Sequence, residues 1–161
     1  MPRTPTAKQL ADPASPGFAL EHSPFFLMNR TISTYALRME RALRQVGADI
    51  PRWRVLMLAS ERGPISVSSI AELAVIRLST ATKVIQRLAR DGLVTIARSP
   101  SDARVSEVRI TAAGRRVARV VRRTASEIFR QAFADVGASE IRSFNRLLRR
   151  LHDNMTRPGG P

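Results

Sequence analysis

Apolar side chains recur every three or four residues over much of this chain, the spacing that places them on one face of an α-helix. The first such helix is expected after Ser23, a good N-cap followed by Pro24 at the first helical position, and it should end at Gly47. A second helix is expected from about Pro51 to Gly63. The apolar stripe of the first helix consists of Met28, Ile32, Tyr35, Met39, Leu43 and Val46.

In the middle of the chain the sequence predicts two shorter helices, followed by two segments in which apolar residues alternate with polar ones. Ser66 is expected to cap a short helix, and a turn leads from it to a helix over 79–91. Residues 93–97 and 105–110 are rich in β-branched side chains at alternating positions, which predicts two strands. The side chains expected to share one face of this hairpin are Val94, Ile96, Val108 and Ile110.

Helical spacing returns after the strands. Thr111 is expected to cap a long helix that Gly137 ends, and Ser139 to cap a last helix that runs to about residue 156. Prolines interrupt any regular pattern before Ser23, so we expect a flexible tail over 1–22 and another over 157–161.

Charge sets this chain apart from an ordinary folded domain. The formal net charge is +14 for 161 residues, and all but two of the 27 basic residues are arginine. Such a surface attracts polyanions and releases the counterions condensed on them, which favours nucleic acid as a partner. The arginine excess alone is weaker support, because codon bias across a genome produces it as well.

Other chemistries find little support. The chain has no cysteine, and His22 and His152 lie near its two ends, so we expect no disulfide, metal site or cofactor. No nucleophile–base pair or phosphate-cradling glycine loop is visible, which argues against an enzyme. Apolar runs fall short of the ~20 residues of a membrane span, and we expect a cytoplasmic protein without a membrane partner.

The helix over 79–91 has two contrasting faces. Its inward stripe is Ala81, Val84, Ile85 and Leu88. Its outward face is Thr80, Thr82, Lys83, Gln86, Arg87 and Arg90, with no carboxylate before Asp91. Glutamine reads adenine and arginine or lysine reads guanine, so this face suits the major groove of DNA. A merely solvated basic face is the alternative interpretation.

The expected hairpin carries cations at its tip. Three cations lie on this two-stranded hairpin, which can bury little surface by itself: Arg98, Arg104 and Arg109. Their clustering indicates that they bind an external partner. Asp102 lies two residues before Arg104 and is placed to hold its guanidinium while the arginine enters a narrow minor groove. An ordinary surface ion pair is the alternative. Helix and hairpin together predict a winged helix-turn-helix.

Several motifs in this region resemble the MarR family of bacterial transcription regulators. They are Ile70-Ala71-Glu72-Leu73-Ala74, Ser79-Thr80-Ala81-Thr82, Leu88, Gly92-Leu93-Val94, Asp102-x-Arg104 and Ile110-Thr111-x-x-Gly114. The resemblance runs from about Trp53 to Gly114 and implies a homodimer paired through its first and last helices. It also implies that 79–91 is the recognition helix and Arg104 the wing-tip arginine. Val75, where glycine is usual, and Arg77, where a small capping residue is common, depart from the pattern.

Members of that family often bind a small aromatic or anionic ligand between the dimer helices and the winged domain. The resemblance places such a pocket here, and the expected lining is Phe26, Arg30, Arg38, Trp53 and Met57. The alternative is that the aromatic and methionine side chains belong to the core.

The apolar faces at both chain ends support the implied dimer. Left exposed, Ile141, Phe144, Leu148 and Leu151 would form a patch larger than monomers usually tolerate, although a monomeric helical subdomain is an alternative. The expected fold is therefore mainly α with a small two- to three-stranded β-wing, a winged helix-turn-helix plus dimerisation helices from both chain ends. Its expected divisions are a tail over 1–22, a dimerisation helix over 23–48, a DNA-binding domain over 49–111, dimerisation helices over 112–156 and a tail over 157–161.

Taken together, the sequence predicts a dimeric regulator that binds a pseudo-palindrome in double-stranded DNA, a repressor released by a small-molecule effector. A sequence-tolerant architectural DNA-binding protein without an effector is the alternative. The residues expected to contact DNA are Arg77, Ser79, Thr80, Thr82, Lys83, Gln86, Arg87, Arg98, Asp102 and Arg104.

Overall fold

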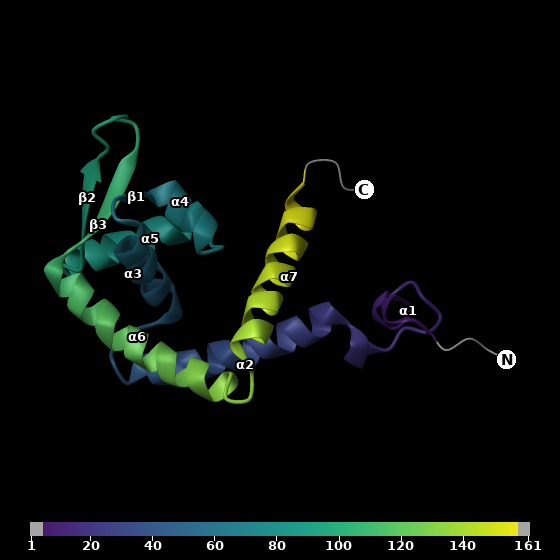
Figure 1. The fold of residues 1–161 in the computed structure, drawn as a ribbon. Coiled ribbons are helices and arrows are strands. Elements are labelled where there is room, and N and C mark those ends of the chain that lie inside the picture. The colour runs from purple at the N-terminus through teal and green to yellow at the C-terminus, as the bar shows by residue number, and fades with distance from the viewer. Residues whose placement is uncertain (1–4, 158–161) are drawn as a thin grey trace. The chain divides into compact units, whose positions relative to one another are not determined.

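The computed structural model describes residues 5–157 and divides the chain into two compact units, one ending at Ala125 and the other beginning at Ser126 (Figure 1). In chain order, the elements are α1 (Ala7–Ala11), η1 (Leu20–His22), α2 (Pro24–Arg44), α3 (Ile50–Arg62), β1 (Ile65–Ser66), α4 (Val67–Leu73), α5 (Leu78–Arg90), β2 (Val94–Arg98), β3 (Ser106–Ile110), α6 (Ala112–Ala132) and α7 (Ala138–Thr156). This is a mainly helical fold with a small sheet, as predicted. No helix among the described residues is long and apolar enough to cross a membrane.

The N-terminal segment contains more regular structure than its prolines predict. In the short helix α1, the Gln9 amide donates to the Thr6 hydroxyl, and the Thr6 amide donates back to the Gln9 side chain at 2.8 Å. This reciprocal pair satisfies two amides that a helix start leaves free. The prolines lie outside α1, so they do not interrupt it. Residues 1–4 and 158–161 of the two expected tails lie outside the described residues.

Three of the four predicted side-chain caps are present. The amide of Phe26 donates to Ser23, that of Ser69 to Ser66 and that of Gly114 to Thr111. The predicted cap at Ser139 is wrong, because α7 begins at Ala138 with Gly137 as its N-cap residue. The Glu140 carboxylate accepts the Gly137 amide at 2.8 Å and so satisfies this helix start, which needs no serine hydroxyl.

The strands before and after α4 and α5 form a three-stranded antiparallel sheet in the order β1-β3-β2. Val94 is paired with Ile110 and Ile96 with Val108, which confirms the predicted register of the hairpin. The third strand is β1, where Ile65 pairs with Val108. It is too short to show an alternating pattern in the sequence. Figure 1 shows the loop between β2 and β3 at the free end of the hairpin, remote from α6.

The core of the first unit lies among α3, α4, α5 and the sheet. Ala81, Ile85 and Leu88 of α5 are buried as predicted, while Val84 is half-buried. They pack in one cluster with Val55, Leu56, Ala59, Ile65, Ile70, Ala71, Val94 and Val108. Burying one apolar face of α5 in this way leaves its polar face outward, which positions the candidate site.

In the second unit, the helix α7 has an apolar face that the rest of this unit leaves partly exposed. No residue of α7 is buried, and Phe144 and Leu147 are each 47% exposed. Ile141, Leu148 and Leu151 are half-buried on the same helix. Phe129 near the end of α6 and Phe133 in the turn that follows it stack with their ring centres 4.7 Å apart.

Candidate nucleic-acid interface

The outward face of α5 carries the residues that the sequence singled out. Ser79, Thr80, Lys83, Gln86 and Arg87 are exposed, and so is Arg77 at the N-cap position. Thr82 is half-buried, and its hydroxyl donates to the Leu78 carbonyl at 2.9 Å, which leaves its methyl group as the outward part. Leu78, which sequence reasoning overlooked, is 55% exposed in the first turn. The face thus offers cations, an amide, hydroxyls and two apolar groups.

The loop over 99–105, which with β2 and β3 forms the wing, is braced by its own side chains. Ser99 is buried, its amide donates to the Val105 carbonyl at 2.8 Å, and its hydroxyl donates to Glu107 at 2.7 Å. Arg98 donates to the Ala103 carbonyl at 2.7 Å, so part of this guanidinium holds the loop. Nothing in the sequence pattern indicated this bracing. It gives the wing tip a defined shape in the absence of a partner.

Arg104 extends from this braced tip. Its side chain is 93% exposed. Its amide and its Nε both donate to one carboxylate oxygen of Asp102, at 2.9 and 3.3 Å. The pairing proposed from the sequence is therefore present. Because an exposed ion pair contributes little to stability, the physical effect of this one is to orient Arg104.

A groove of about 350 Å³ lies between the starts of α4 and α5 and the wing. It is lined by Ser66, Val67, Ser68, Leu78, Thr82, Arg104, Val105 and Ser106. Thr82 and Arg104, which are distant in sequence, thus lie on one surface. Ser66 and Ser68 add hydroxyls from the start of α4 that sequence reasoning did not include.

Carboxylates near this surface are engaged by neighbouring groups. Asp91, at the end of α5, pairs with Arg52, and Glu107 accepts from Ser99 and from Arg109. The exposed cations of α5 and the wing therefore dominate the local potential, which suits the phosphates of DNA. Within residues 5–157, no cluster of histidine and acidic side chains is suited to hold a metal ion.

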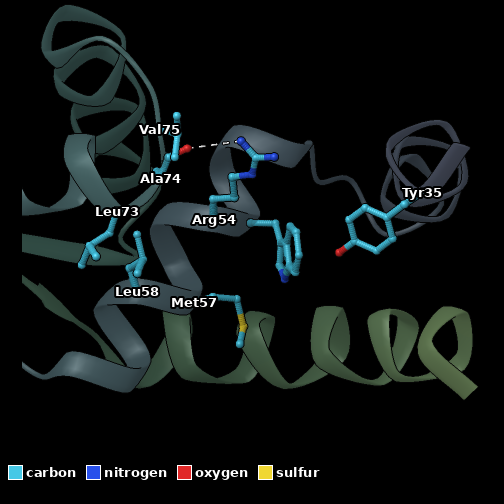
Figure 2. A pocket seen from close by; sticks show the side chains of 8 residues that line it. Tyr35, Arg54, Met57, Leu58, Leu73, Ala74 and Val75 are labelled. Atoms are coloured by element: carbon cyan, nitrogen blue, oxygen red, sulfur yellow. Dashed lines mark hydrogen bonds between the residues drawn. The ribbon is translucent and has the colours of Figure 1, made fainter. Parts of the chain in front are cut away.

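A second cavity, of about 560 Å³, lies beside the helix-turn-helix (Figure 2). It is lined by Tyr35, Trp53, Arg54, Met57, Leu58, Leu73, Ala74 and Val75. The buried Trp53 Nε1 has no hydrogen-bond partner in the described structure. Burial raises the pKa of the Tyr35 hydroxyl while the Arg54 cation opposes that rise, so the phenol stays neutral near pH 7. The polar groups of this cavity are therefore mainly hydrogen-bond donors.

The structure brings together some of the residues expected to hold a ligand. Trp53 and Met57 line the cavity, whereas Phe26, Arg30 and Arg38 on α2 do not. Phe26 is half-buried and the two arginines are exposed. Tyr35 and Arg54 line it instead. The sequence placed Tyr35 in an apolar stripe, and nothing distinguished Arg54 from the other arginines around it.

Comparison with known proteins adds independent information. A MarR family model matches residues 49–106. The HTH-type transcriptional repressor IacR from Pseudomonas putida is 38% identical over 144 residues, which cover 89% of this chain and 86% of that protein. A MarR-family regulator from Silicibacter pomeroyi is 24% identical, covers 89% of this chain and 96% of its own, and superposes with a TM-score of 0.79.

A further structure, CouR from Rhodococcus jostii bound to p-coumaroyl-CoA, is 20% identical, covers 89% of this chain and 99% of its own, and gives a TM-score of 0.75. The last two similarities establish the fold. The family match and the identity to the Pseudomonas relative, which extends over most of both chains, establish the lineage. This chain belongs to the MarR family of transcription regulators.

Proposed function

We propose that this protein is a homodimeric repressor that binds a pseudo-palindromic DNA operator and is released from it by a small aromatic or anionic ligand. The observation that carries the DNA part is the groove that Thr82 of α5 and Arg104 of the wing line together. A helix in the major groove and an arginine beside it both require such a shared surface. The repressor assignment follows the name of the Pseudomonas putida relative.

The homodimer rests on the apolar face of α7. A helix that buries no residue in its own chain yet carries Phe144, Leu147 and Leu148 gains stability by pairing with another copy. Pairing also explains how one basic chain becomes sequence-specific. Two recognition helices related by a twofold axis read two half-sites about 10 base pairs apart, which doubles the number of base contacts.

The ligand part rests on the cavity beside the helix-turn-helix. Trp53 Nε1 and the Arg54 guanidinium donate hydrogen bonds but cannot accept them, and Tyr35 and Met57 supply apolar contact area. A planar molecule with an acceptor group, such as a carboxylate, complements this lining. The p-coumaroyl group of the ligand bound in the Rhodococcus jostii structure is likewise planar and aromatic.

The test is selection of duplexes by the purified chain from a random pool, followed by fluorescence anisotropy titrations. We expect the selected duplex to bind at least about 10³-fold more tightly than a shuffled duplex of the same composition at physiological salt. Equal affinity for both duplexes, with a steep salt dependence, would instead identify the architectural DNA-binding protein.

A further inference from the structure

The turn between α4 and α5 holds a valine in an unfavourable backbone conformation. Val75 has φ of 54°, in the left-handed region that favours glycine. The amide of Val75 donates to the Glu72 carbonyl and that of Ile76 to the Ala71 carbonyl, each at 3.0 Å. This is the hydrogen-bond pattern of a helix end at which the residue after the cap is usually glycine.

No burial compensates this strain. Val75 is 86% exposed, although a β-branched residue in this conformation is strained. Relaxing φ to negative values requires the peptide group between Ala74 and Val75 to rotate. Whatever holds that peptide group therefore holds the turn.

Arg54 of α3 holds it. Its Nη1 donates to the Ala74 carbonyl at 3.2 Å, and this carbonyl belongs to the peptide group that joins Ala74 to Val75. Figure 2 shows the Arg54 side chain directed at Ala74, with the bond drawn as a dashed line. A partly buried, charged donor forms a stronger hydrogen bond than a neutral one.

The start of α5 has no side-chain cap, and the core holds the helix only from Ala81 onward. Its N-cap residue, Arg77, makes no capping hydrogen bond with its side chain. The strained turn therefore strongly influences how the first turn of α5, with Ser79 and Thr80, is oriented.

We infer that Arg54 is a positioning residue for DNA binding: by fixing the Ala74–Val75 peptide group it keeps α5 in the orientation that fits the major groove. This inference rests on the proposed function. Arg54 also lines the cavity beside the turn, so the bond connects the wall of the cavity with the recognition helix.

The test is a double-mutant cycle on affinity for the selected duplex. Arg54→Met should weaken binding about tenfold, because the strained turn then relaxes. Val75→Gly, which adopts the left-handed conformation without strain, should leave affinity close to the native value. In the Val75→Gly background, Arg54→Met should change affinity by about twofold or less.

Arg52→Met is the matched control. It removes a cation from the same helix together with a tertiary ion pair, the one with Asp91 at the other end of α5. Any loss of DNA affinity caused by Arg52→Met should be the same in the native and in the Val75→Gly background. Thermal melting of every variant checks that it is folded.

Amide hydrogen exchange at Ile76 provides a readout that needs no DNA. Arg54→Met should speed this exchange about tenfold in the native background and leave it unchanged in a chain that also carries Val75→Gly. Independent effects of the two substitutions in both measurements would overturn the inference. A native chain that selects no duplex would refute the proposed function instead, while the exchange measurement would still test the role of Arg54.

Discussion

At the scale of single residues, the wing tip shows how an exposed arginine acquires direction. Asp102 accepts from both the amide and Nε of Arg104, so the guanidinium leaves the loop along a restricted path. If Arg104 binds DNA as proposed, it loses less conformational freedom on binding than a free arginine would. The same carboxylate does little for the stability of the free protein.

Arg104→Ala should weaken binding to the selected duplex about tenfold, because a charge and a groove contact are both lost. Arg109→Ala is the control, since Arg109 has a partner in Glu107 and does not line the groove. Affinity titrations at moderate salt compare the two. Full affinity in the Arg104 variant would contradict the wing assignment.

Substitutions at two exposed residues of α5 should have different effects on DNA binding. Gln86→Ala removes an amide that can read a base edge, so we expect relaxed preference at one base pair and an unchanged salt slope. Lys83→Ala removes a cation, so binding to all duplexes should weaken and the slope should fall by about one. Titrations of single-base variants at several salt concentrations measure both quantities. If the two variants behave alike, base reading by Gln86 is wrong.

At the scale of elements, the junction of the wing with α6 depends on a close approach. The Thr111 hydroxyl bonds to the carbonyls of Gly92 and Leu93, and Gly114 packs against the same carbonyl of Leu93. A Cβ at position 114 would lie 2.0 Å from that oxygen. This close packing explains why the motif Thr-x-x-Gly ends in glycine here.

Gly114→Ala should therefore lower the free energy of unfolding by about 2–4 kcal/mol, since backbone rather than a flexible side chain must move. Chemical denaturation measures the change. The control is Ala113→Gly, one residue earlier in the same helix, which should lose about 1 kcal/mol or less. Equal losses at the two positions would show that the close approach does not matter.

The elements also show how far sequence patterns reach. Ser23, Ser66 and Thr111 were predicted correctly as N-caps. Each hydroxyl stands just before a run of helically spaced apolar residues and accepts from an amide three residues later, so the whole signal lies in the local sequence. At the start of α7 the same rule selected Ser139, since it does not weigh a glutamate that caps from inside the first turn.

Features that depend on distant partners escaped prediction. The strand β1 forms because β3 pairs with it, and neither its length nor its composition is typical of a strand in the sequence. Likewise Val75 was recognised as unusual for its turn, but only the folded chain brings Arg54 to the preceding carbonyl. The exposed residues of α5 were found because the helical period sorts them by face, whereas the cavity around Trp53 combines residues from separate elements.

At the scale of the whole molecule, the charge of +14 and the apolar face of α7 have separate effects. Charge alone provides affinity for any duplex, with strong salt dependence. In the proposed dimer, pairing of two chains would fix the distance between the two copies of α5, and that distance would make a symmetric operator the preferred target.

Phe144→Glu should convert the dimer to a monomer at micromolar concentration, because it places a charge in the apolar face of α7. Ser139→Glu, on the opposite side of the same helix, adds the same charge and should leave the dimer intact. Sedimentation velocity measures both. A monomer in the unsubstituted chain would end the dimer proposal, and dimers in both variants would exclude α7 from the interface.

Hydroxyl-radical footprinting on the selected duplex tests most directly whether two wings and two recognition helices act as one symmetric unit. We predict two equivalent protected tracts about one helical turn apart, related by a twofold axis at the centre of the site. Uniform protection along the duplex, without a centre of symmetry, would contradict this account.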